Sequence, residues 1–64
     1  MNANEIAAYA KGAGAAVTGK MLPTSYSGSI ARAFRMGKNE AAAKAGTISN
    51  DGAAWLELDR AFFS

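Results

Sequence analysis

The apolar residues of the N-terminal third recur with the period of a helix. They stand at i, i+4, i+7 and i+11, as Ile6, Ala10, Ala13 and Val17. Asn2 and Glu5 have capping-box spacing, so we predict a helix over residues 2–19 that turns this apolar face inward. Gly12 and Gly14 are each unfavourable by about 0.8–1 kcal/mol in a helix interior, so either the helix breaks there or another backbone packs closely against it. We expect close packing.

The next segment predicts a loop and a second helix. Residues 18–27 contain the only proline among Thr, Gly, Ser and Tyr, and they form the main loop. Ser27 or Ser29 can cap a helix that ends at Gly37, where a left-handed C-cap costs glycine nothing. Arg32 and Arg35, three positions apart, share its outer face. Its inward residues are Ile30, Ala33 and Phe34.

A third helix is predicted from an Asn39 cap to Gly46. Together with the second helix it gives the order helix, glycine turn, helix over residues 29–46, which is the pattern of a helix-turn-helix. Small and apolar residues of that pattern are present at Ala33, Met36, Gly37 and Ala43. Arg32 and Lys38, however, occupy positions where apolar residues are usual, so the match is partial. Two ordinary helices joined by a glycine cap are the alternative.

The C-terminal part changes its pattern from helical period to alternation. Asn50, Asp51 and Gly52 form a strong turn signal, and apolar residues alternate over residues 53–58 after it. A short β-hairpin is the prediction, with Phe62 and Phe63 bringing the chain end back to the core. The whole chain, residues 1–64, is therefore predicted as one α+β domain, a small three-helix unit followed by a C-terminal β-hairpin.

Composition limits what this domain can do. Sixteen of the 32 hydrophobic residues are alanine, so the core must be thin and a partner would stabilise the chain. Cys and His are both absent, which removes disulfides and thiolate metal ligands, the usual general base and the usual zinc ligand. We expect no enzyme, no cofactor and no metal site. No stretch of about 20 apolar residues and no signal peptide is present, so we expect no membrane partner and a cytoplasmic location.

Two local patterns could carry chemistry, and both are incomplete. Residues 14–20 fit G-x-x-x-x-G-K, the phosphate-binding loop, but Met21 stands where a hydroxyl should hold magnesium. Glu57 and Asp59 would point to the same side of a strand, yet no third ligand or base lies nearby. Neither pattern supports a nucleotide site or an active site.

The formal charge of +2 is unevenly distributed. Residues 11–44 carry a net +5 and residues 45–64 a net −2, so the middle of the chain is predicted to meet an anionic surface. Solvated lysines and arginines that keep an alanine-rich chain dissolved are the alternative. The predicted binding residues are Lys20, Arg32, Arg35, Lys38, Asn39, Lys44 and Trp55.

The order of three helices and a hairpin resembles a minimal winged helix-turn-helix domain. This resemblance implies DNA binding, with phosphates contacted by the arginines and lysines of residues 32–44 and by Lys20. Asn39, at the start of the recognition helix, would be available for a base edge. Against DNA, the third helix is mostly alanine and the wing tip is acidic.

A second likeness is to the small early proteins of T7-like bacteriophages that inhibit host RNA polymerase. It is carried by residues 40–49 and 52–55, which look like the third helix and hairpin of those proteins. It implies a phage origin, a bacterial host and a transcriptional target, reached through DNA or through polymerase. On polymerase or a sigma factor, Trp55, Tyr9 or Phe63 would be the anchor. The rival hypothesis is a structural or assembly protein that self-associates through Ala8, Gly12 and Ala16.

Overall fold

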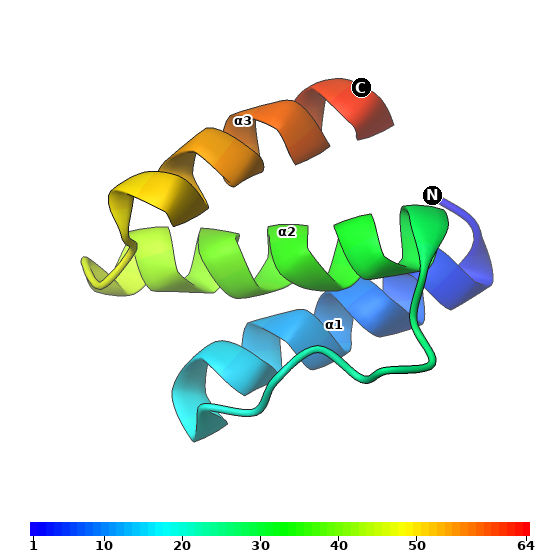
Figure 1. Cartoon of the computed structure of the whole chain (residues 1–64), viewed down its shortest axis with the longest axis horizontal. Coiled ribbons are helices and arrows are strands. Elements are labelled where there is room, and N and C mark those ends of the chain that lie inside the picture. The colour runs from blue at the N-terminus through cyan, green and yellow to red at the C-terminus, as the bar shows by residue number, and fades with distance from the viewer.

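Three helices and no strand make up the chain, as a computed structural model describes it for residues 1–64 (Figure 1). They are α1 (Ala3–Thr18), α2 (Gly28–Ala45) and α3 (Asn50–Phe63). The central helix is α2, with α1 packed on one side and α3 on the other, and α1 and α3 do not pack on each other. The molecule measures 28 × 25 × 17 Å, so the helices form a flat layer. No helix has the length and hydropathy needed to span a membrane.

The first helix forms where the sequence predicts it, but it turns a different face inward. The capping box is present: the Asn2 side chain accepts from the Glu5 N–H, and the Glu5 carboxylate accepts from the Asn2 N–H, both at 2.8 Å. The predicted inward face is wrong, because Ile6 is 55% and Val17 87% exposed. The buried residues are instead the small ones, Ala8, Gly12 and Ala15. They let the α1 backbone approach α2 more closely than the larger side chains would.

The approach of α1 to α2 depends on two glycines. A Cβ on Gly12 would lie 1.9 Å from the Phe34 carbonyl oxygen, and a Cβ on Gly37 would lie 2.1 Å from the Tyr9 carbonyl oxygen. Real Cβ atoms do not approach other atoms so closely, so only glycine fits at either position. The expected close packing is thus confirmed at Gly12. Gly14 has no neighbour within 4 Å, and there the expectation is wrong.

The predicted break at Gly37 is absent. A single 18-residue helix, α2, runs through Gly37, so there is no helix-turn-helix and Asn39 is not an N-cap. Glycine is needed at position 37 because it has no Cβ, and not because its φ is positive. The sequence alone does not distinguish these two reasons for a glycine, so Gly37 resembles a C-cap. Gly46 does end α2 in the left-handed region, at φ 76°, as predicted.

The predicted β-hairpin is wrong, and the likeness to a winged helix-turn-helix fails with it. Residues 50–63 form α3, and the Ser49 hydroxyl caps it by accepting from the Gly52 N–H at 3.0 Å. The Asn-Asp-Gly sequence is the first turn of this helix. Gly52 lies where a Cβ would come within 2.9 Å of the Asn39 side chain, so glycine allows α3 to start close to α2. Residues at helical spacing then pack inward, namely Leu56, Asp59 and Phe63.

The core is as thin as the composition predicts. Only nine of the 64 residues are buried, and the main cluster is Ala8, Ala15, Ala33 and Phe34. Tyr26, from the loop between α1 and α2, packs edge-on against Phe34 with ring centroids 5.9 Å apart. Phe63 also packs against this cluster, so the predicted return of the chain end to the core is confirmed for that residue. Most of both broad faces of the layer therefore remains open to a partner.

Candidate functional site

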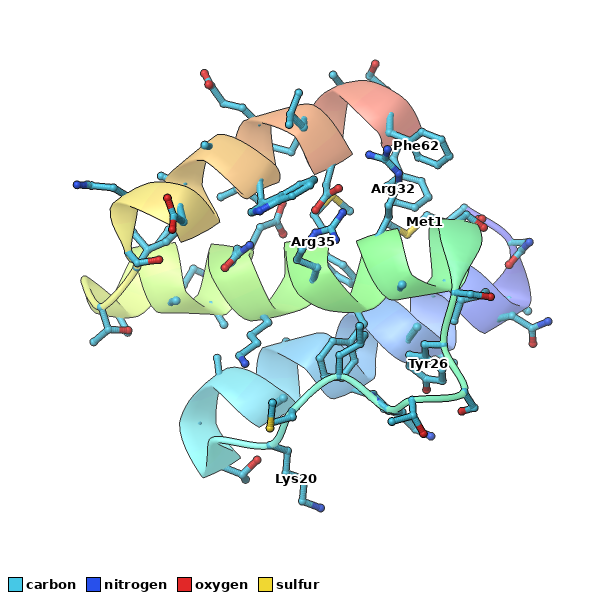
Figure 2. All side chains as sticks on the ribbon, viewed as in Figure 1. Met1, Lys20, Tyr26, Arg32, Arg35 and Phe62 are labelled. Atoms are coloured by element: carbon cyan, nitrogen blue, oxygen red, sulfur yellow. The ribbon has the colours of Figure 1, made fainter.

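A fully buried carboxylate holds two arginines between α2 and α3. Asp59 accepts from Arg35 through Nε at 2.9 Å and Nη2 at 2.8 Å, and from Arg32 Nη1 at 3.3 Å. Figure 2 shows both arginines rising from α2 into the space under α3. The two-bond contact fixes the plane of the Arg35 guanidinium, and the hydrogen bonds to Asp59 raise the pKa of Arg35.

Each of these arginines also lies against an aromatic ring of α3. The Arg35 Cζ is 4.2 Å from the centre of the Trp55 ring, and the Arg32 Cζ is 4.6 Å from the centre of the Phe62 ring. Contacts of this kind contribute about 0.5–1 kcal/mol at exposed sites. The carboxylate and the rings together hold both guanidinium groups in place, and the arginines in turn hold the rings.

The rings are nevertheless open to solvent. Trp55, Leu58 and Phe62 are 44%, 57% and 52% exposed, and they follow one another at i, i+3 and i+7 along one side of α3. We call these three residues the α3 ridge. Two arginines balanced by one aspartate leave one positive charge at its base. The α3 ridge is thus a row of exposed apolar side chains beside two arginines whose charge exceeds that of Asp59 by one.

Lys20 and Lys38, two of the predicted binding residues, lie beside the α1–α2 loop rather than on the ridge. Lys20 follows the end of α1 and projects away from the ribbon (Figure 2). Lys38 lines a small hollow with Arg35 and with Met21 and Leu22 of the loop. Neither lysine forms an ion pair.

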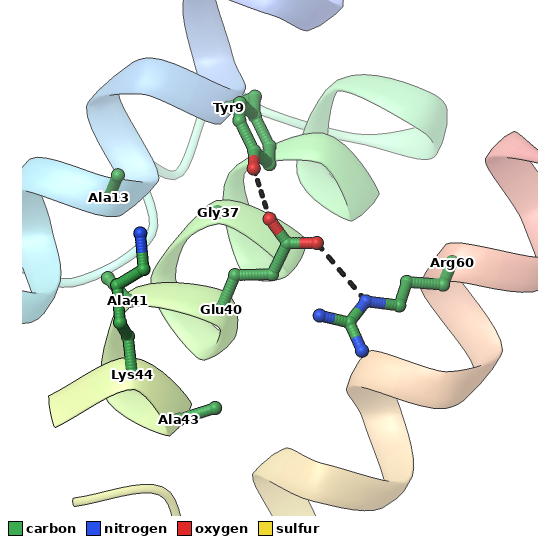
Figure 3. A pocket seen from close by; sticks show the side chains of 8 residues that line it. All are labelled: Tyr9, Ala13, Gly37, Glu40, Ala41, Ala43, Lys44 and Arg60. Carbon is green, nitrogen blue, oxygen red and sulfur yellow. Dashed lines mark hydrogen bonds and ion pairs between the residues drawn. The ribbon is translucent and has the colours of Figure 1, made fainter. Parts of the chain in front are cut away.

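Lys44 belongs to a separate groove between α1 and α3. This groove has a volume of about 550 Å³ and contains Glu40, which links Tyr9 of α1 to Arg60 of α3 (Figure 3). The Tyr9 hydroxyl donates to Glu40 Oε1, and Arg60 Nε donates to Glu40 Oε2 at 3.2 Å. The hydrogen bond to Glu40, together with burial and the negative charge, raises the pKa of Tyr9.

Asn39 lines another hollow, together with Ile48 and Ser49 near the start of α3. The structure therefore joins three of the seven predicted residues, Arg32, Arg35 and Trp55, into one constellation. It places Lys38 beside Arg35, and it places Lys20, Asn39 and Lys44 elsewhere.

Sequence reasoning missed Asp59, Leu58 and Phe62. The signal for the ridge was present, because Trp55, Leu58 and Phe62 have helical spacing, but residues 53–58 also alternate like a strand. Asp59 was paired with Glu57 as a candidate carboxylate couple. In the helix Glu57 is exposed while Asp59 is buried, so the two carboxylates do not act together. No cluster of three metal-ligating side chains occurs in the structure.

Comparisons with protein-family models, with curated proteins and with solved structures found no match to this chain.

Proposed function

We propose that this chain is a small regulatory binding protein that inserts the α3 ridge into an apolar groove of a larger protein. The observation that carries the proposal is the exposed row of Trp55, Leu58 and Phe62 at i, i+3 and i+7. Helices that dock into grooves use anchors at this spacing, and Trp is among the residues most enriched at binding hot spots. Their support by Arg35 and Arg32 fixes the rings before binding, which lowers the entropy lost on association.

The partner's surface follows from the chemistry of the ridge. Its groove is apolar, to accept the three anchors, and it carries carboxylates on the side that faces Arg32 and Arg35. One positive charge in excess at the base of the ridge favours such a rim.

A protein suits this surface better than DNA does. Arg32 and Arg35 already donate to Asp59, which leaves fewer of their N–H groups for phosphates. Lys44 lies in another groove, so the basic residues of the middle segment do not form one continuous strip. Bacterial RNA polymerase is the partner to test first. The reason is the sequence likeness to the phage inhibitors alone, because the separate third helix and the hairpin of that likeness are absent from the fold.

The self-association stripe proposed for a structural protein is largely occupied. Ala8 and Gly12 are buried, and Gly12 lies directly against the α2 backbone. Of that stripe only Ala16 stays partly exposed. These contacts favour a binding protein over an assembly that packs through α1.

The test measures binding of the fluorescently labelled chain to purified bacterial RNA polymerase, and separately to duplex DNA, by anisotropy. We expect saturable binding to polymerase that Trp55→Ala weakens about 30-fold, the loss typical of a hot-spot residue. Val17→Ala is the control, because Val17 is also an apolar side chain and is 87% exposed, but it lies on α1. Binding to duplex DNA alone, or equal affinity of Trp55→Ala and the unmodified chain for polymerase, would overturn the proposal.

A further inference from the structure

A second apolar surface lies under the loop between α1 and α2. Two hollows meet there and share Met21 and Phe34, one of about 430 Å³ beside α1 and one of about 270 Å³ beside α2. The floor is Phe34, which is buried, whereas Met21 is 84% exposed and lies over the junction. We call the two hollows together the loop trough. Its remaining apolar lining comes from Ala15, Leu22 and Pro23.

Only positive charge borders the loop trough. Lys11 and Lys20 line the hollow beside α1, and Lys38 lines the hollow beside α2 together with Arg35, whose charge is already paired with Asp59. No Asp or Glu lines either hollow, and none of the three lysines forms an ion pair. The groove that holds Glu40 differs in this respect, because there Arg60 is paired with a carboxylate. The loop trough thus combines an apolar floor with free ammonium groups at both ends.

We infer that the loop trough binds a single-chain anionic amphiphile, such as a long-chain carboxylate. The acyl chain would lie on Phe34 and beneath Met21, and the carboxylate would meet the ammonium group of Lys11. The Lys20 side chain, which projects outward in the structure, would turn toward the same carboxylate. Both hollows lie near or within the range of about 300–1,000 Å³ found for small-molecule sites. Methionine suits such a position, because its unbranched side chain adapts to ligands of different shape.

The shape of the surface favours a single molecule over a membrane. A bilayer presents a broad plane, whereas this surface is concave with a buried ring at its floor. The ligand's chemistry, an anionic head on an acyl chain, is common to free carboxylates and to anionic lipids. Separate arms of the experiment distinguish these two sources.

The experiment titrates the ¹⁵N-labelled chain with decanoate below its micelle concentration and follows the amide shifts. We expect saturable shifts at residues around the trough, with smaller shifts on α3. Decyltrimethylammonium carries the same chain with the opposite charge, so it should bind at least about tenfold more weakly. Anionic and neutral phospholipid vesicles form the second arm, read by co-sedimentation.

Two variants locate the site. Lys11→Gln/Lys20→Gln should weaken decanoate binding at least about fivefold, and Met21→Ser should weaken decanoate and the cationic amphiphile together. Lys44→Gln is the matched control, because it removes one charge from the separate groove of Glu40 and should leave binding unchanged.

Three results would overturn the inference. They are equal binding of the two amphiphiles, shifts centred on the α3 ridge, and binding to anionic vesicles without binding to decanoate. The ridge and the trough are tested with different variants, so failure of either proposal leaves the other standing.

Discussion

The side chain of Asp59 decides how α3 sits on α2. It is the only charged residue that is fully buried, and its carboxylate accepts hydrogen bonds from Arg32 and Arg35. These two arginines lie against the rings of Phe62 and Trp55, which are on the same helix as the aspartate. Because Arg32 and Arg35 remain 36% and 31% exposed, water can partly replace the carboxylate if it is removed. Asp59 therefore fixes the geometry of the ridge as well as contributing to stability.

Replacement of Asp59 by Asn should lower the free energy of unfolding by about 2 kcal/mol. This is less than the roughly 3–5 kcal/mol lost from fully buried pairs, since both arginines can hydrate. Urea unfolding followed by circular dichroism measures the change. Glu57→Gln, an exposed carboxylate on the same helix, should change stability by less than about 0.5 kcal/mol, and a similar loss in both variants would contradict the assigned role.

The contact between Tyr9 and Glu40 makes the stability of the folded chain depend on pH in the alkaline range. Because the folded-state pKa of Tyr9 is raised, the stabilisation is fully present below the ordinary tyrosine pKa of about 10 and is lost as pH rises through the folded value. Tyr9→Phe should therefore be less stable than the unmodified chain near neutral pH. The difference should shrink as the pH rises above the ordinary tyrosine pKa of about 10 in urea unfolding, and a difference independent of pH would contradict this account.

At the scale of elements, the sequence predicts caps and loops better than it predicts faces. The Asn2 box, the Gly19 and Gly46 ends and the main loop depend on local backbone chemistry, which a few adjacent residues determine. The inward face of α1 could not be predicted by hydrophobicity, because the small residues pack and the large ones remain outside. The predicted break in α2 and the predicted hairpin are wrong because each was inferred from a glycine that does not form a turn. Gly37 allows the α1 backbone to come close, and Gly52 lies in the first turn of α3.

The candidate site was predictable in part. Arg32, Arg35 and Trp55 stood out by charge and by size, but their meeting depends on how α3 crosses α2. That crossing is a long-range property, held by the contacts of Asp59 with the two arginines, and a strand in place of α3 would have placed the same residues differently.

The glycine contacts give a test that separates helix propensity from packing. Gly12→Ala should cost about 3 kcal/mol or more, or prevent folding, because its Cβ would overlap the Phe34 carbonyl oxygen. Gly14→Ala should instead stabilise the chain by about 0.5–1 kcal/mol, since nothing lies near and alanine favours the helix. Thermal unfolding of the two variants should move in opposite directions. Equal shifts of the same sign would show that α1 does not contact α2 as described.

At the scale of the whole molecule, a flat layer behaves differently from a closed bundle. The α1–α2 pair is held by backbone contact at two glycines, while α3 is held to α2 chiefly by Asp59, Leu56 and Phe63. Since α1 and α3 do not contact each other directly, we expect α3 to separate once Phe63 leaves the core cluster, with the α1–α2 pair still held at its two glycines. A partner that covers the ridge would add stability by mass action.

Native-state hydrogen exchange should reveal this division. We expect the amides in the middle of α3 to exchange at least about tenfold faster than those in the middle of α2, through an opening that leaves α1 and α2 folded. Saturation with a ridge-binding partner should slow exchange in α3 selectively. Uniform protection across all three helices would indicate a single cooperative unit instead.

The crossing at Gly12 and Gly37 also limits how this sequence can diverge. A clash with a side chain can be relieved by shortening that side chain, but the obstacle at each of these positions is a main-chain oxygen that every residue carries. Shortening a neighbouring side chain therefore cannot rescue the loss of either glycine. Distant relatives that keep this fold should be recognisable by the two glycines and by an acidic residue facing two arginines, even after the alanine-rich remainder has changed beyond alignment.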